Sequence, residues 1–322
     1  MATRKKSTGS QQLRLDEPEP QARPVARKRP ASPSPMDRLM DAAIEIQQNP
    51  DAVERAYMAR QLVQCTLPHS DPGDQSVWVR TNGHLTLAIR PNVDLKTRKP
   101  LYPYGSIPRL LLFWIVTEAT QKKSRRIHLG NSLDAFMREI GLNPRTGGGK
   151  RGDAKRLHDQ MERLFRSTIT FEDRREWGKS YVDMQVAPRG QFWWDPSRAH
   201  QDNIWESWVE LGEDFFAAIT AAPVPVDMRA LRGLKRSPLA LDLYALLTHT
   251  AFAASRKGTS RSIPWEGLHT QMGAEYAQLR QFRAKVLAAL RRIQVVYPTL
   301  KVETTEDALV VHPSRPAIAA RS

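Results

Sequence analysis

The chain has a single cysteine, Cys65, which excludes an internal disulfide and a thiolate metal cluster. It also has no apolar run near the roughly 20 residues that a membrane-spanning helix needs. The longest such run, near residues 110–116, has the length of a core helix. The N-terminus lacks the apolar block of a secretory signal. We therefore expect a cytoplasmic protein with no membrane partner.

Acidic residues are scarce relative to basic ones. Lys and Arg number 49 against 34 Asp and Glu, which gives a net charge of +15 and an isoelectric point near 10.2. This balance favours a polyanionic partner such as DNA or RNA, although a basic surface facing only solvent is an alternative. Hydrophobic residues make up 40% of the 322 residues, which is enough for a packed core and about two domains.

Composition divides the chain into four segments. Residues 1–35 contain six prolines, eight Lys or Arg and three Asp or Glu, and this predicts a disordered basic arm. The arm could attract phosphates or serve only as a solubilising tail. We expect a first domain over residues 36–220, a second over 221–316, and a frayed tail over 317–322.

One helical pattern occurs twice, with an offset of 125 residues. Each copy has four apolar positions at helical spacing, and its cations point away from them at about 100° per residue. A turn ending in glycine, Gly141 or Gly273, precedes each copy, and an alternating hairpin follows it. This order is typical of a helix-turn-helix with a β-wing, so we predict an α+β fold of two tandem winged-helix domains. The apolar positions are Leu157, Met161, Leu164 and Phe165, and then Phe282, Val286, Ala289 and Leu290.

Other elements follow from periodicity and turn signals. Two helices are expected over residues 36–65, with Asn49 capping the second and Pro50 at its first position. Asn82-Gly83 predicts a hairpin turn. Hairpins are expected at 77–89, 168–186 and 299–312, a strand at 127–129, and helices at 106–121, 132–140, 153–166, 239–252, 265–273 and 274–296.

The loop at residues 147–152, GGGKRG, resembles a phosphate-binding loop only in its glycines. Lys150 is followed by Arg151 rather than Ser or Thr, and a helix precedes the loop instead of a strand. A flexible turn is one alternative to a nucleotide site, and backbone contact with a DNA phosphate is the interpretation we favour. The candidate DNA-binding residues are Lys150, Arg151, Lys155, Arg156, Arg163 and Arg166, then Arg174, Arg175 and Lys179 at the hairpin tip, and Arg280, Arg283, Arg291 and Arg292.

Catalytic signals are weak. The histidines are scattered and have no cysteine partners, so we expect a protein that is not an enzyme and has no cofactor. A cluster of four acidic residues leaves a magnesium site open, with a solvated junction as the alternative. Those residues are Glu206, Glu210, Glu213 and Asp214. Five of the eight tryptophans lie between Trp177 and Trp208, where they could stack unpaired bases or cover a seam.

Three stretches carry a family resemblance: YPYGSIPRLLLFWIVTEA (102–119), GNSLDAFMREIGL (130–142) and TGGGKRGDAKRLHDQMERLF (146–165). Together they resemble the RepA-type replication initiators of broad-host-range, IncW-like plasmids. The resemblance implies binding to origin repeats (iterons), opening of the neighbouring duplex, and recruitment of the host helicase and host initiator. It also implies self-association as a dimer. A nicking or priming enzyme, a transcription repressor and an RNA-binding protein are the alternatives.

Overall fold

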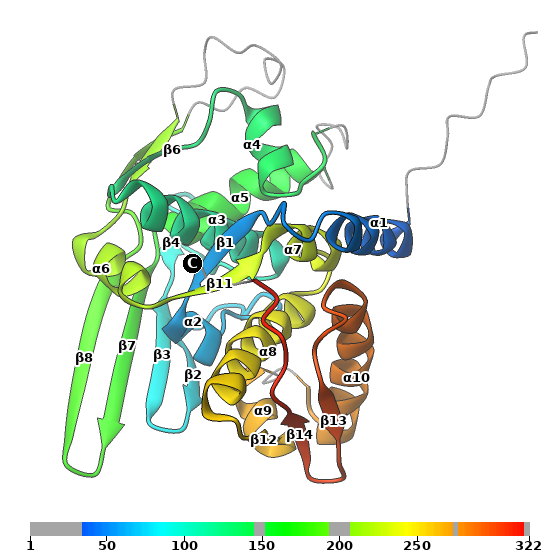
Figure 1. Ribbon diagram of the computed structural model, residues 1–322. Helices are drawn as coiled ribbons and strands as arrows, with labels where there is room; N and C mark the ends of the chain where they lie inside the picture. Colours follow the sequence, from blue (N-terminus) through cyan, green and yellow to red (C-terminus); the bar gives the residue numbers. More distant parts are fainter. Residues whose placement is uncertain (1–33, 145–151, 193–206, 273–275, 319–322) are drawn as a thin grey trace, which may run out of the picture. The chain divides into compact units, whose positions relative to one another are not determined.

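The computed structural model describes residues 34–144, 152–192, 207–272 and 276–318 (Figure 1). By its contacts the chain divides after Pro33, and the fold reported below is that of Ser34–Ser322. The arm predicted for residues 1–35 lies almost wholly outside the described residues. So do Lys150, Arg151 and most of the predicted tail.

Helices and short strands alternate along the described chain. The helices are α1 (Pro35–Gln48), α2 (Arg60–Gln64), α3 (Ser106–Lys122), α4 (Leu133–Glu139), α5 (Asp153–Phe165), α6 (Glu213–Ala221), α7 (Met228–Leu234), α8 (Pro238–Lys257), α9 (Trp265–Met272) and α10 (Leu279–Val296). The strands are β1 (Arg55–Ala59), β2 (Trp78–Asn82), β3 (Leu85–Arg90), β4 (Asn92–Val93), β5 (Pro100–Leu101), β6 (Arg126–His128), β7 (Thr168–Arg175), β8 (Gly178–Gln185), β9 (Arg189–Gln191), β10 (Trp208–Glu210), β11 (Pro223–Asp227), β12 (Arg261–Pro264), β13 (Val302–Thr304) and β14 (Ala308–Val311).

In the first half, α3, β6, α4, α5 and the hairpin β7–β8 follow one another in the predicted order. The Ser132 hydroxyl accepts a hydrogen bond of 3.1 Å from the Ala135 amide, which starts α4 as the sequence predicts. Gly141 ends the turn after α4 with φ +81°. A Cβ there would lie only 2.8 Å from the Arg232 Cγ, so both backbone and space favour glycine.

The second half repeats this order as α8, β12, α9, α10 and the hairpin β13–β14. Its three strands form one antiparallel sheet in the order β12-β14-β13. The predicted start of the long helix at Ala274 is wrong: α10 begins at Leu279, because Gln278 has extended backbone angles and acts as the N-cap. No helix within the described ranges is long and apolar enough to cross a membrane.

The sheets of the first half differ from those of the second. The hairpin β7–β8 does not stand alone but joins β2–β3 in a sheet of order β2-β3-β7-β8, with Leu87 opposite Phe171. The four strands run side by side in Figure 1. Strand β6 pairs with β10 instead, and β10 with β9. The predicted hairpins at 77–89 and 168–186 are therefore confirmed, and the structure adds their pairing with each other.

The prediction of two helices over residues 36–65 is wrong for the second of them. Asn49 is the C-cap of α1, since its amide donates to the Glu45 carbonyl at 3.0 Å. Strand β1 lies within the region in which the second helix was expected and pairs antiparallel with β11, so only the short helix α2 remains there. Ala56 and Met58 are buried and alternate with partly exposed neighbours, a period of two that favours a strand.

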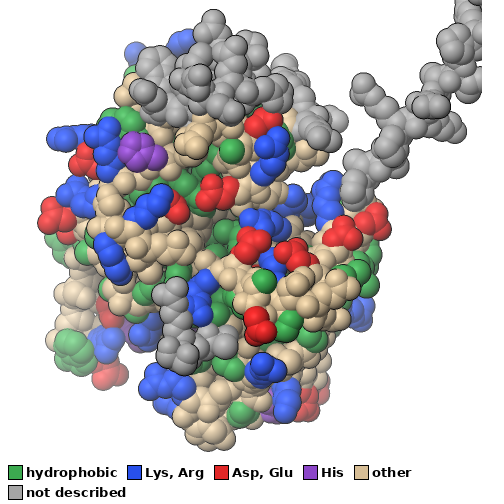
Figure 2. All heavy atoms as spheres, turned by 45° about the horizontal axis from the view of Figure 1, so that its top comes forward, with side chains coloured by type: hydrophobic (Ala, Val, Ile, Leu, Met, Phe, Trp, Pro, Cys, Tyr) green, Lys and Arg blue, Asp and Glu red, His purple; other side chains and the backbone are tan. Residues whose placement is uncertain are grey.

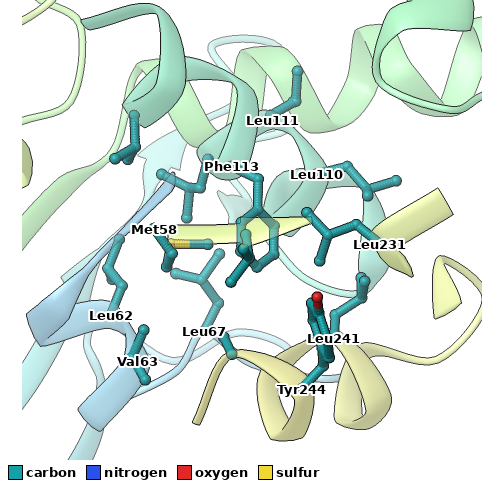
Figure 3. Packing of buried hydrophobic residues seen from close by; sticks show 14 of the residues in the cluster. Met58, Leu62, Val63, Leu67, Leu110, Leu111, Phe113, Leu231, Leu241 and Tyr244 are labelled. Carbon is teal, nitrogen blue, oxygen red and sulfur yellow. The ribbon is translucent and has the colours of Figure 1, made fainter. Parts of the chain in front are cut away.

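Buried side chains from distant segments meet in one continuous core. Figure 3 shows Phe113 of α3 among Met58 of β1, Leu62 of α2, Leu231 of α7 and Leu241 of α8. This packing and the β1–β11 ladder both cross the predicted boundary between residues 220 and 221. The division into domains 36–220 and 221–316 stays a prediction.

A buried ion pair connects α3 and α8, the helices with which the repeated order of elements begins in each half. Arg109 of α3 and Asp242 of α8 form two hydrogen bonds, Nε to Oδ1 and Nη2 to Oδ2, both of 2.8 Å. The remaining guanidinium N–H groups donate to the carbonyls of Leu67, Pro68 and Gly105 at 2.6–3.0 Å. Burial would raise the pKa of the Asp242 carboxyl, but the Arg109 charge and the hydrogen bonds from His69 and Arg109 hold that pKa below its usual value.

Replacing Asp242 with Asn is expected to lower the free energy of unfolding by about 3–5 kcal/mol, because it leaves the buried Arg109 charge without a counter-ion. Urea denaturation followed by circular dichroism measures the change. Asp159→Asn, at an exposed position of α5, should stay within about 0.5 kcal/mol of the parent chain. Equal effects of the two substitutions would contradict a stabilising role for the buried pair.

Acidification from about pH 7 to about pH 5 is expected to destabilise the fold. Burial and the Arg109 cation lower the pKa of His69, while its hydrogen bond to Asp242 opposes them. The unfolded chain therefore binds a proton at His69 more readily than the folded chain, and stability falls as the pH drops below the unfolded pKa. Urea denaturation across this range should show a shallower pH dependence for His69→Gln. An identical dependence in both proteins would refute this assignment.

Candidate nucleic-acid interface

Helix α5 buries the predicted apolar stripe and exposes most of its cations. Leu157 and Leu164 are fully buried, whereas Lys155, Arg156 and Arg166 are exposed. Carboxylates of the same helix neutralise part of this face. Arg156 lies 3.4 Å from an oxygen of Asp153, and Arg166 lies 3.1 Å from one of Glu162. Among the described residues Lys155 has neither an ion-pair nor a hydrogen-bond partner.

Arg163 is engaged by its own chain. Its Nη1 donates to the Tyr102 carbonyl at 3.2 Å, and its guanidinium lies 5.4 Å from the centroid of the Tyr104 ring. An oxygen of Asp71 is 3.8 Å away. These contacts attach α5 to the segment that precedes α3. They give Arg163 a structural role that its direction on the helix does not reveal.

The hairpin β7–β8 carries its charges as local pairs. Arg174 and Lys179 each lie 2.8 Å from an oxygen of Glu172. Their hydrogen bonds, that of Lys179 first, lower the pKa of the Glu172 carboxyl. Arg175 pairs with Asp173 at 2.9 Å. The predicted basic tip is therefore largely neutralised, and its most exposed large side chain is Trp177.

Helix α10 presents cations without carboxylates. The helix contains no Asp or Glu, and its apolar stripe is buried as predicted. Within the parts of the chain that the structure describes, its four exposed cations have no ion-pair or hydrogen-bond partner. Those cations are Arg280, Lys285, Arg291 and Arg292. The sequence prediction omitted Lys285, although its position next to the apolar Val286 on an acid-free helix was a usable signal.

Arg283 departs from the rest of α10. It is partly buried, its guanidinium lies 5.0 Å from the centroid of the Trp265 ring, and Nη2 donates to the Thr305 carbonyl at 3.3 Å. It therefore joins α10 to α9 and to the turn of β13–β14. Like Arg163, it holds neighbouring elements in place.

The acidic cluster and the tryptophans have partners too. Arg125 lies 3.6 Å from carboxylate oxygens of both Glu210 and Glu213. The Arg126 guanidinium lies 4.0 Å from the centroid of the Trp208 ring, so Trp208 makes a cation–π contact with the neighbouring strand. Glu206, Trp193, Trp194 and Trp205 lie outside the described residues.

The surface seen in Figure 2 mixes both signs of charge. Lys and Arg side chains are interspersed with Asp and Glu across this face. Opposite charges at such spacing reduce the long-range attraction for a polyanion. A helix whose cations have no carboxylate beside them, as on α10, is therefore the stronger candidate for contact with a nucleic acid.

Arg163→Ala is expected to lower the free energy of unfolding by about 1–2 kcal/mol, since it removes a hydrogen bond and a cation–π contact. Lys155→Ala on the same helix should change stability by less than about 0.5 kcal/mol. Thermal and urea denaturation of the two variants measure this difference. If the two substitutions cost the same, Arg163 has no special structural role.

The chain is similar to a known protein family and to a solved structure. A family model described as "Plasmid encoded RepA protein" matches residues 102–266, just over half of the chain. The match runs from just before α3 to the first residues of α9, so α10 lies beyond it. No curated protein matches the chain. Among solved structures, the chain is similar to domains 2 and 3 of RctB, with 12% identity and a TM-score of 0.45 over 77% of this chain and 94% of that one.

Proposed function

The chain belongs to the family of plasmid-encoded RepA proteins, and we propose that it initiates plasmid replication by binding double-stranded DNA at the plasmid origin. The repeated order of elements supports this proposal most directly. In each half, a helix with a buried apolar stripe and outward cations follows a shorter helix and precedes a hairpin. This is the order of a winged helix, in which the second helix of the motif enters the major groove.

We propose that α10 provides most of the phosphate contacts. Its exposed cations form no ion pair with any described residue, so each can release counter-ions from DNA without first breaking such a pair. On α5, Lys155, Arg156 and Arg166 are the candidates for contact with DNA. Arg163 and Arg283 instead donate hydrogen bonds to backbone carbonyls of neighbouring segments and hold these helices in place.

The finer steps of initiation are proposals as well. We propose that the chain binds repeated sites, that several bound copies bend and open the neighbouring duplex, and that the complex recruits the host helicase and host initiator. Bending energy stored in wrapped DNA can offset the cost of unstacking. We also propose that the chain acts by binding rather than catalysis. The pairing of Glu210 and Glu213 with Arg125 supports this, because it occupies the carboxylates that a magnesium site would use.

Arg291→Gln combined with Arg292→Gln is expected to weaken binding to origin DNA and to unrelated duplex alike, and to lower the slope of log affinity against log salt by about two. Fluorescence anisotropy on a labelled duplex, at salt concentrations from about 50 to about 200 mM, measures both effects. The matched control is Lys96→Gln with Lys99→Gln, which removes two exposed cations between β4 and β5.

That control should bind as the parent chain does. The parent should lose about 10³–10⁵-fold in affinity over the salt range if it makes about 6–10 phosphate contacts. It should also bind a duplex from the origin of its plasmid more tightly than an unrelated duplex. Equal affinity for both duplexes at about 150 mM salt would refute origin recognition.

A further inference from the structure

A pocket of about 620 Å³ lies where α2, α8, β12 and α9 meet, away from the exposed face of α10. We call it the α8–β12 pocket. Arg60 of α2, Arg256 and Lys257 at the end of α8, and Arg261 of β12 line it, and the described residues of its lining include no Asp or Glu. Such a volume suits a small ligand. The described lining therefore carries positive charge that no lining carboxylate balances.

The four cations of this pocket are not neutralised elsewhere. None of them has an ion-pair partner within the described ranges. Arg256 is held only loosely, with its guanidinium 6.0 Å from the centroid of the Phe252 ring. The Nε of Arg261 is buried and has no hydrogen-bond acceptor in the described structure. A buried donor without an acceptor lowers the stability of the unliganded fold, and so does the repulsion between like charges. A bound anion would offset both effects.

Neutral donors complete the lining. Thr250 and Ser262, which carry hydroxyl groups, also line the pocket. The side-chain amide of Gln271, which also lines the pocket, donates to the Val63 carbonyl at 3.2 Å. This bond fixes one wall, because it ties α9 to α2. The pocket therefore combines a wall held by a hydrogen bond with exposed basic side chains at the end of α8.

We propose that the α8–β12 pocket binds a phosphate group. Arginine side chains match the geometry of phosphate oxygens, and several cations without carboxylates favour a dianion over a single carboxylate. The phosphate can come from a free phosphate-bearing molecule or from the backbone of bound DNA. In the second case the pocket extends the proposed DNA interface and rests on that proposal.

The residues around Arg60 indicate the route by which a DNA backbone would reach the pocket. Arg60 and Gln64 also line an adjoining pocket that includes Arg175 and Tyr181 of the β7–β8 hairpin. Polar and basic side chains thus continue from the α8–β12 pocket toward that hairpin. Asp173 lies in this stretch and pairs with Arg175, so the strongest positive charge stays at α8 and β12.

Inorganic pyrophosphate is the probe for a free ligand, and isothermal titration calorimetry with the full chain at constant ionic strength measures its binding. Arg256→Gln combined with Lys257→Gln changes two exposed residues at a helix end, so the variant should fold. We expect this variant to bind pyrophosphate at least about tenfold more weakly than the parent chain. The Arg291→Gln and Arg292→Gln variant removes the same charge from α10 and should bind pyrophosphate as the parent does.

DNA binding by the same variants distinguishes the two sources. Loss of pyrophosphate binding with an unchanged salt slope for DNA supports a free phosphate-bearing ligand. A salt slope lowered by about two, with pyrophosphate competing against DNA in the parent but not in the pocket variant, supports a backbone phosphate. If the pocket variant matches the parent in both assays, the site is refuted. Failure of origin recognition would appear in the parent chain itself and leaves the pyrophosphate result intact.

Discussion

The Arg109–Asp242 pair is the interaction on which the arrangement of the two halves depends. A guanidinium that is 1% exposed is tolerated only when its donors are satisfied. Asp242 accepts two of the hydrogen bonds, and the backbone of residues 67, 68 and 105 accepts the others. Helix α5 packs on α3, and α10 packs on α8. The pair therefore connects the two helices, α3 and α8, on which the basic helices α5 and α10 pack.

The positive charge of the protein is distributed unevenly over these helices. On α5 the arginines pair with carboxylates one turn away, and in β7 Arg174 pairs with a carboxylate two residues away on the same strand. On α10 the helix supplies none. Two helices that resemble each other in their buried stripe thus differ in what they offer to a polyanion. The family match covers α5, the helix whose arginines are paired, and α10 lies beyond the match.

The helices and hairpins could be predicted from local sequence patterns. The pairing of strands that lie far apart in the sequence could not. The stripe of Leu157 and Phe282 and the Asn82-Gly83 turn are visible in a short window, because they depend on neighbours in sequence. The β1–β11 and β3–β7 ladders join strands separated by long stretches of chain, and no short window contains both. The same holds at the candidate site. A helical period places Arg163 outward from its stripe, but only the packed segment around Tyr102 makes it a structural residue.

Unpaired cations in the second half form two groups, on α10 and at the α8–β12 pocket. The α10 cations and three of the four pocket cations lie on the consecutive elements α8, β12 and α10, whereas Arg60 belongs to α2. Like charges that are not neutralised destabilise the unliganded fold, and a ligand that binds only the folded state recovers that free energy by mass action. If phosphate binds at these two groups as proposed, its binding stabilises the folded second half.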